Sequence, residues 1–154
     1  MTEQIRKNVF ETNSSSSHSL TVSQGDLSNI PFSIEVVREG VIYLEKGEYG
    51  WEWQQYFDTL SKLNYLFTQV VGDVPSGEAQ EVTQGLRESN SYFDMLCRVV
   101  EEHTGVKVMA TPGTKGYVDH QSTDVGLELF ENEAQLKQLL FCDNSYIETD
   151  NDNY

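Results

Sequence analysis

The chain has 154 residues, 38% of them hydrophobic, which is enough to bury one sizeable core in a single domain. Its net charge of −15, from 25 acidic and 10 basic residues, argues against direct binding of DNA or RNA, because little basic surface is left to neutralise phosphates. No apolar run reaches the ~18–20 residues of a membrane span, and no apolar stretch of the kind found in a secretory signal follows the N-terminal residues, so we expect a cytoplasmic protein without membrane association.

The most unusual stretch comes early, at residues 11–19, Glu-Thr-Asn-Ser-Ser-Ser-Ser-His-Ser. It lies between two short apolar segments, 8–10 and 20–22, and we expect strands over residues 5–10 and 18–22. Small polar residues do not build a core, so we predict a loop whose hydroxyl and backbone N–H groups can cradle an anion, cap a helix or line a pocket. A plain solvated loop is the alternative. The candidate ligand-binding residues of this loop are Asn13, Ser14, Ser15, Ser16 and Ser17.

Residues 32–45 carry the clearest strand pattern of the chain. Residues 32–37, Phe-Ser-Ile-Glu-Val-Val, alternate apolar and polar side chains as a half-buried strand does, and Arg-Glu-Gly at 38–40 is typical of a turn. Residues 41–45 are rich in β-branched and aromatic side chains. Together these segments predict an antiparallel hairpin.

A second unusual stretch, Lys-Gly-Glu-Tyr-Gly-Trp-Glu-Trp, spans residues 46–53. Its aromatic residues, Tyr49, Trp51 and Trp53, can form a surface for stacking or for a partner protein. Alternation also puts Trp51 and Trp53 on one side of an extended segment, which favours packing in the core. Three residues here are candidates for contact with a ligand: Glu48, Trp51 and Glu52.

Apolar residues at helical spacing, together with capping residues, predict three helices. They cover residues 58–71, residues 91–104 and a short segment after Asn132. Their N-caps are Asp58, Asn90 and Asn132, and Gly72 and Gly105 end the first two. Residues 72–90 have glycines, a proline and few large apolar side chains, so we predict a loop there, with at most a weak helix at 78–84.

The order of these elements defines the expected fold class. Residues 106–110 are a further strand candidate, and residues 142–149 close the domain. Because helices and strands are interspersed and the predicted strand pair is antiparallel, we expect a single α+β domain over residues 1–149. It should have a small, mainly antiparallel sheet and about three helices, and an acidic tail should follow at 150–154.

The cysteines and acidic clusters give no sign of a metal centre. Cys97 and Cys142 occur in apolar helical patterns, so we expect buried free thiols rather than a disulfide. The chain has no Cys-x-x-Cys motif and no cluster of Cys and His that would indicate zinc. The acidic residues near the C-terminus lack the glycine and the final glutamate of an EF-hand. We therefore expect neither a metal nor a cofactor.

The chain has three histidines, the side chains best suited to proton transfer near neutral pH. His103 continues the apolar stripe of its helix, and a role at the helix end is favoured for it. The other two lie among small polar residues, and together with their neighbours they give four candidate catalytic residues: His18, Asp119, His120 and Ser122. Imidazole, carboxylate and hydroxyl groups support acid–base or nucleophilic chemistry when they meet, whereas hydrogen bonds within turns are the alternative role.

Known catalytic motifs match weakly or not at all. His120-Gln121-Ser122 fits one His-x-Ser/Thr motif of a 2H phosphoesterase, but the threonine that follows His18 comes one residue too late. The glycine and lysine of a Walker loop do not surround Ser14–Ser17, and the Gly-x-Ser-x-Gly elbow of hydrolases is absent.

Residues 10–20, Phe-Glu-Thr-Asn-Ser-Ser-Ser-Ser-His-Ser-Leu, resemble the N-terminal signature of a group of uncharacterised proteins from bacteriophages and mobile regions of bacterial genomes. The stretches Gly-Glu-Tyr-Gly-Trp-Glu at 47–52 and Asp-His-Gln-Ser at 119–122 are similar to further recurrent segments of this group. The resemblance spans most of the chain and implies a phage or mobile-element origin. It implies no activity and supplies no catalytic residues, although small acidic phage proteins are often inhibitors of host machinery.

Two functions from different classes fit these observations. The first is a small acidic phage-type accessory protein that binds and inhibits a host protein, with carboxylates that complement a basic surface and exposed aromatic side chains as anchors. The second is an enzyme or a binder of a nucleotide or other phosphate-bearing ligand, with a pocket built from the 14–19 loop and the 119–122 segment. Solubility alone is the plain explanation of the charge. No feature favours a structural role, and the oligomeric state is left open.

Overall fold

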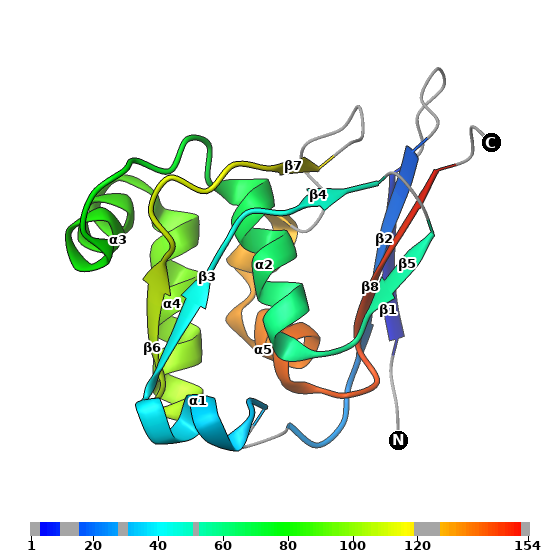
Figure 1. Cartoon of the computed structure of the whole chain (residues 1–154). Helices are drawn as coiled ribbons and strands as arrows, with labels where there is room; N and C mark the ends of the chain where they lie inside the picture. Colours follow the sequence, from blue (N-terminus) through cyan, green and yellow to red (C-terminus); the bar gives the residue numbers. More distant parts are fainter. Residues whose placement is uncertain (1–3, 10–15, 28–30, 51–52, 119–126, 152–154) are drawn as a thin grey trace.

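The computed structural model describes residues 4–9, 16–27, 31–50, 53–118 and 127–151, and for residues 4–9, 16–18, 150 and 151 it describes the backbone alone (Figure 1). The described part contains five α-helices, one 3₁₀-helix and eight strands, which confirms the α+β class. In chain order the elements are β1 (Gln4–Val9), β2 (Ser16–Ser23), α1 (Ile34–Glu39), β3 (Val41–Leu44), β4 (Glu48–Tyr49), β5 (Gln54–Tyr56), α2 (Thr59–Val70), α3 (Ala79–Ser89), α4 (Ser91–Thr104), β6 (Lys107–Ala110), β7 (Tyr117–Val118), η1 (Leu127–Glu131), α5 (Glu133–Phe141) and β8 (Tyr146–Asn151).

The largest sheet has four antiparallel strands in the order β1-β2-β8-β5. β1 and β2 confirm the two strands predicted on either side of the serine stretch, and they pair with each other, with Val9 opposite His18. β8 lies between β2 and β5, so strands from both ends of the chain share one sheet. Leu20 of β2 and Ile147 of β8 are fully buried, and α2 and α5 lie on that side of the sheet (Figure 1). No described helix covers the other side.

Two further pairs of strands are parallel, and the sequence did not predict either pairing. β3 pairs with β6, with Val41 opposite Lys107, and β4 pairs with β7, with Glu48 opposite Tyr117. In each pair the two strands are more than 60 residues apart in sequence, and α2, α3 and α4 lie between them in the chain. The prediction of a mainly antiparallel sheet therefore holds for the largest sheet alone.

The hairpin predicted at residues 32–45 is wrong. Its first half is the helix α1, which begins after Ser33, whose side chain accepts a hydrogen bond from the Val36 N–H, and ends at Gly40 in the left-handed conformation (φ 73°). Capping at both ends outweighs the alternating pattern in this short segment. The second half is the strand β3, as predicted, but its partner is the distant β6 rather than residues 32–37.

The three predicted helices are confirmed as α2, α4 and α5, and each of their predicted N-cap side chains accepts a backbone hydrogen bond. The predicted number of helices is too low, because α1 and α3 were not expected as full helices. α3 lies in the region predicted to be mostly loop, where Val82 and Leu86 provide enough apolar surface to pack on the core. Gly72 does not end α2, since the C-cap is Val71 in an extended conformation.

Two boundaries near the chain ends also differ from the prediction. β2 begins at Ser16, two residues before the predicted start of the strand at His18, so Ser16 and Ser17 belong to the strand rather than to the loop. β8 runs to Asn151, which is opposite Ser16 and lies two residues inside the predicted tail. Because β2 pairs on both sides, backbone hydrogen bonds outweigh the modest strand preference of serine.

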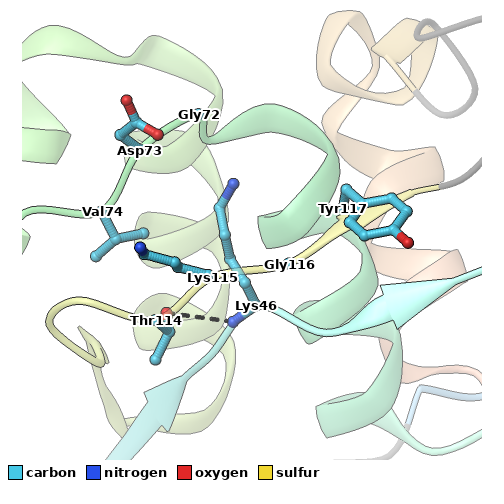
Figure 2. A pocket seen from close by; sticks show the side chains of 8 residues that line it. All are labelled: Lys46, Gly72, Asp73, Val74, Thr114, Lys115, Gly116 and Tyr117. Carbon is cyan, nitrogen blue, oxygen red and sulfur yellow. Dashed lines mark hydrogen bonds between the residues drawn. The ribbon is translucent and has the colours of Figure 1, made fainter.

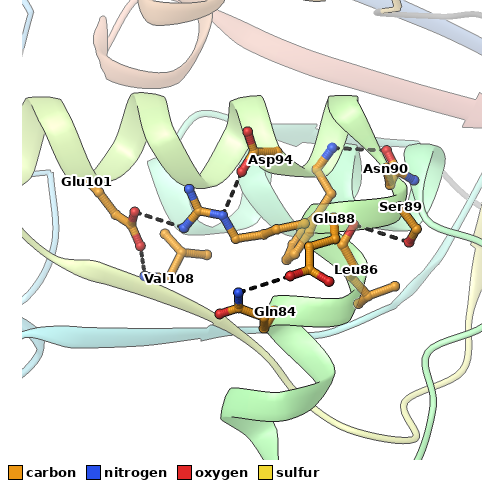
Figure 3. A network of polar contacts seen from close by, with 10 residues as sticks. Gln84, Leu86, Glu88, Ser89, Asn90, Asp94, Glu101 and Val108 are labelled. Carbon is orange, nitrogen blue, oxygen red and sulfur yellow. Dashed lines mark hydrogen bonds and ion pairs between the residues drawn. The ribbon is translucent and has the colours of Figure 1, made fainter.

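A polar network fixes α3 against the rest of the core (Figure 3). Arg87 of α3 donates from Nε to Asp94 at 2.7 Å and from Nη1 to Glu101 at 3.0 Å, and both carboxylates belong to α4. The second oxygen of Glu101 accepts a hydrogen bond from the Val108 N–H of β6 at 3.1 Å. One guanidinium group therefore links α3 to α4 and, through Glu101, to β6.

Candidate functional site

Most of the predicted site residues lie outside the part of the chain that the structure describes. These are Asn13, Ser14, Ser15, Trp51, Glu52, Asp119, His120 and Ser122. Three others, Ser16, Ser17 and His18, are described by their backbone as part of β2, where His18 is opposite Val9 on one side and Thr149 on the other. The convergence of His18 with the 119–122 segment therefore stays a prediction.

The structure does bring the 46–53 stretch next to the residues that precede the 119–122 segment. β4, from the 46–53 stretch, runs parallel to β7, which leads into the 119–122 segment, and Tyr49 is opposite Val118. A Cβ atom on Gly116 would lie 2.3 Å from the Gly47 carbonyl oxygen, so glycine is required for this close approach of the two backbones. Glu48, the described ligand candidate in this stretch, is exposed.

The aromatic residues of the second stretch have different roles. Tyr49 is buried against Tyr65 and Tyr56, with ring centroids 5.1 and 5.5 Å away, and burial raises the pKa of its hydroxyl to about 12. Tyr49 is therefore a core residue and not part of a binding surface. Trp53, in contrast, is 54% exposed, so the packing in the core that alternation favoured is wrong for this residue.

His103 has the structural role predicted for it. It lies in the last turn of α4, which ends at Gly105, and its ring stacks on Phe141 with centroids 4.1 Å apart. A histidine in the last turn interacts favourably with the helix dipole.

The side of the four-stranded sheet that no described helix covers carries exposed aromatic rings next to its edge strand β5, whereas Ser19 and Thr21 of β2, on the same side, are buried. In β5, Tyr56 packs on the core and Gln55 is opposite Glu148 on the other side of the sheet. Strand alternation extended by one residue at each end assigns Trp53 and Phe57, both exposed, to the side of Gln55. Gln55 donates from Nε2 to Glu148 Oε1 of the neighbouring β8 at 2.8 Å. Phe57, 44% exposed, packs on Tyr146 of β8 with ring centroids 4.7 Å apart.

An acidic side chain shares this side of the sheet, since Glu148 follows Tyr146 on the same side of β8. Two further exposed acidic residues are close in sequence to the rings: Asp58, whose side chain caps α2, and Asp143, before β8. We call the surface formed by Trp53, Gln55, Phe57, Tyr146 and Glu148 the aromatic face.

A second feature is a pocket of about 580 Å³ between the loop after α2 and the loop before β7 (Figure 2). Lys46, Asp73, Lys115 and Tyr117 are among the residues that line it. Burial lowers the pKa of Lys46, and the nearby carboxylate of Asp73 partly opposes this effect. The sequence prediction missed this pocket, because its parts lie in three separate loops.

No protein-family profile, curated protein or solved structure matches the chain. Within the described ranges, no group of three or more His, Cys, Asp or Glu side chains is arranged to hold a metal ion. No helix in the same ranges has both the length and the apolar character needed to cross a bilayer.

Proposed function

We propose that this protein is a phage-type accessory protein that binds a host protein with a basic surface and inhibits it, and that the aromatic face makes the contact. The observation that carries the proposal is the pair of exposed aromatic rings, Trp53 and Phe57, beside β5 of a sheet side that no described helix covers and that also carries Glu148. The phage origin and the inhibition rest on the resemblance of residues 10–20 and on the net charge of −15.

The chemistry of the aromatic face suits a protein partner. Aromatic residues are enriched among the side chains that dominate binding energy at interfaces, because each buries a large area at a low cost in conformational entropy. The contact of Phe57 with Tyr146 and the hydrogen bond of Gln55 to Glu148 order part of the face before a partner arrives. Carboxylates at the rim then select a positively charged partner and accelerate its association.

The first experiment is affinity capture from host lysate with the tagged full-length chain, read by mass spectrometry. Wild type is compared with the double variant Trp53→Ser, Phe57→Ser and with Tyr43→Ser, a control that removes a ring with 53% exposure from a different sheet. We expect one stoichiometric partner with wild type and with the control, and loss of this partner with the double variant. A partner retained equally by all three proteins would contradict the proposal.

A second comparison tests the charge. The variant Asp58→Asn, Asp143→Asn, Glu148→Gln neutralises Glu148 of the aromatic face and two exposed carboxylates close in sequence to Phe57 and Tyr146, and asparagine at position 58 can still cap α2. The control Glu39→Gln, Glu102→Gln, Glu131→Gln removes the same charge from exposed positions elsewhere. We expect the first variant alone to weaken capture and to reduce its dependence on salt. If both variants weakened capture of the partner equally, binding would depend on the net charge of the protein rather than on the carboxylates of this surface.

A further inference from the structure

The pocket between the loop after α2 and the loop before β7 is lined by two cations in a strongly acidic chain. Lys46 and Lys115 are two of the ten basic residues, and no ion pair with either is found in the described part of the chain. Figure 2 shows both side chains extending toward the segment 72–74 on the far wall of the pocket. Asp73 is the carboxylate that lines the pocket with them.

Contacts between distant segments fix the relative position of the two lysines. The Lys46 N–H donates to Thr114 Oγ1 at 3.4 Å, and Thr114 Oγ1 donates in turn to the Thr111 carbonyl at 3.2 Å, within the loop that carries Lys115. The Tyr117 N–H donates to the Gly47 carbonyl at 2.9 Å, just beyond the two lysines. The backbones that hold both cations are therefore ordered before any ligand binds, which lowers the entropic cost of binding.

We infer that this pocket binds a small-molecule phosphate ester, with the phosphate group between Lys46 and Lys115. A phosphate monoester carries a charge of about −1.5 to −2 at neutral pH, which is close to the charge needed to neutralise two ammonium groups. A single carboxylate would neutralise only one of them. Lysine binds phosphate as a point charge and does not need the fixed geometry of arginine. The net charge of the chain opposes this binding weakly, because salt screens charges beyond about 8 Å at physiological ionic strength.

The volume of the pocket and one aromatic side chain in its lining indicate what kind of organic group the phosphate carries. A volume of about 580 Å³ lies within the usual range for small-molecule sites and leaves room for an organic group beside the phosphate. Tyr117 lines the same pocket and its side chain is 44% exposed. A ring or sugar attached to the phosphate can pack on this side chain, so nucleoside monophosphates and sugar phosphates are the ligand class.

Isothermal titration of the full chain with four probes tests this inference: inorganic phosphate, ribose 5-phosphate, adenosine monophosphate and adenosine. We expect the two esters to bind more tightly than inorganic phosphate, and adenosine not to bind. A higher affinity for adenosine monophosphate than for ribose 5-phosphate would identify a nucleotide, and equal affinity would identify the sugar phosphate. Absence of binding by both esters, or binding of adenosine as tight as that of its monophosphate, would overturn the inference.

Four charge variants make the test specific to this pocket. Lys46→Gln and Lys115→Gln should each weaken ester binding by about tenfold or more, as expected for the loss of one charged contact. The control Lys107→Gln removes an exposed lysine of β6 and should leave the affinity unchanged. Asp73→Asn should strengthen binding, because it removes the carboxylate that competes with the phosphate. Equal weakening by Lys107→Gln would overturn the inference.

This inference does not depend on the aromatic face. The double variant Trp53→Ser, Phe57→Ser should bind the esters with wild-type affinity, because neither residue lines the pocket.

Discussion

Phe57 and Tyr146 pack ring against ring on the side of the four-stranded sheet that no described helix covers, with centroids 4.7 Å apart. Phe57 follows β5 and Tyr146 begins β8, so the pair joins two neighbouring strands at one end of the sheet. The contact leaves Phe57 44% exposed, although a ring of this size is usually buried. We propose that a partner protein covers the exposed part of the Phe57 ring.

The exposure of Phe57 predicts that its removal affects binding more than folding. Phe57→Ser loses the contact with Tyr146, which is worth about 0.5–1.5 kcal/mol for an aromatic pair, together with a part of the ring's buried area. We expect the free energy of unfolding, measured by urea denaturation, to fall by no more than about 2 kcal/mol. The fully buried Phe67 is the matched control, since Phe67→Ala should cost about 3–5 kcal/mol. Similar losses for the two variants would contradict the description of Phe57 as a surface anchor.

The close approach of β4 and β7 predicts strong sensitivity at Gly116. A Cβ atom there would lie 2.3 Å from the Gly47 carbonyl oxygen and 2.8 Å from its nitrogen, both backbone atoms that cannot rotate away. We expect Gly116→Ala to lower the free energy of unfolding by about 1–3 kcal/mol, as overpacking does. Gly72→Ala is the control in the same pocket, because no atom lies within 4 Å of its Cβ position. Equal melting temperatures for the two variants would show that the two backbones can separate without cost.

The buried Lys62 predicts an unusual dependence of stability on pH. Its side chain is fully buried, Nζ donates to the Ser145 carbonyl at 3.0 Å and to the Cys142 carbonyl at 3.4 Å, and burial lowers its pKa to about 8 from 10.5. The unfolded chain therefore binds more protons than the folded chain between pH 8 and 10.5. Stability consequently rises with pH through this window, by up to about 3 kcal/mol for this group.

The variant Lys62→Met isolates this effect, because other groups that titrate in the window are common to both proteins. Cys97 is one of them, and its raised pKa acts in the opposite direction. Urea denaturation at pH 7, 8, 9 and 9.5 should show wild type gaining stability relative to Lys62→Met as the pH rises above 8. A constant difference between the two proteins would mean that Lys62 titrates at its ordinary pKa.

Because both cysteines are buried, we predict that they react slowly with thiol reagents. Cys97 is fully buried in α4, and burial raises the pKa of its thiol to about 12, although Arg87 opposes this effect. Cys142 is 2% exposed, and both thiols are free, as the sequence predicted. Because the thiolate is the reactive form, we expect labelling by iodoacetamide at pH 8 only at the rate at which the chain opens. Rapid labelling of either cysteine in the folded protein would contradict the burial described.

The parts of the fold that the sequence predicted are those with local signals. Asp58, Asn90 and Asn132 are side-chain caps at the start of regular apolar stripes, and each begins a helix. The prediction of a hairpin at 32–45 was wrong because the six residues 32–37 are too few to distinguish the pattern of a strand from that of a short capped helix. The parallel pairs β3–β6 and β4–β7 join residues more than 60 positions apart, and no local pattern encodes such a pairing.

The candidate site could be predicted only in part for the same reason. Trp53 was recognised as an aromatic residue of interest, but its exposure depends on β5 pairing with the distant strand β8. Phe57 and Tyr146 meet only because of that pairing. Lys46 and Lys115 were not identified, because two separated lysines form a site only when β4 and β7 bring their loops together.

The most direct test of the proposed binding surface is hydroxyl-radical footprinting of the chain, free and saturated with the partner that affinity capture identifies. The reaction rate of each aromatic side chain reports its exposure to solvent. We predict that the partner protects Trp53 and Phe57 strongly and leaves Tyr43, which is as exposed as Trp53 in the free protein, unchanged. Unchanged reactivity of Trp53 and Phe57 in the saturated complex would contradict the assignment of the aromatic face as the site where the partner binds.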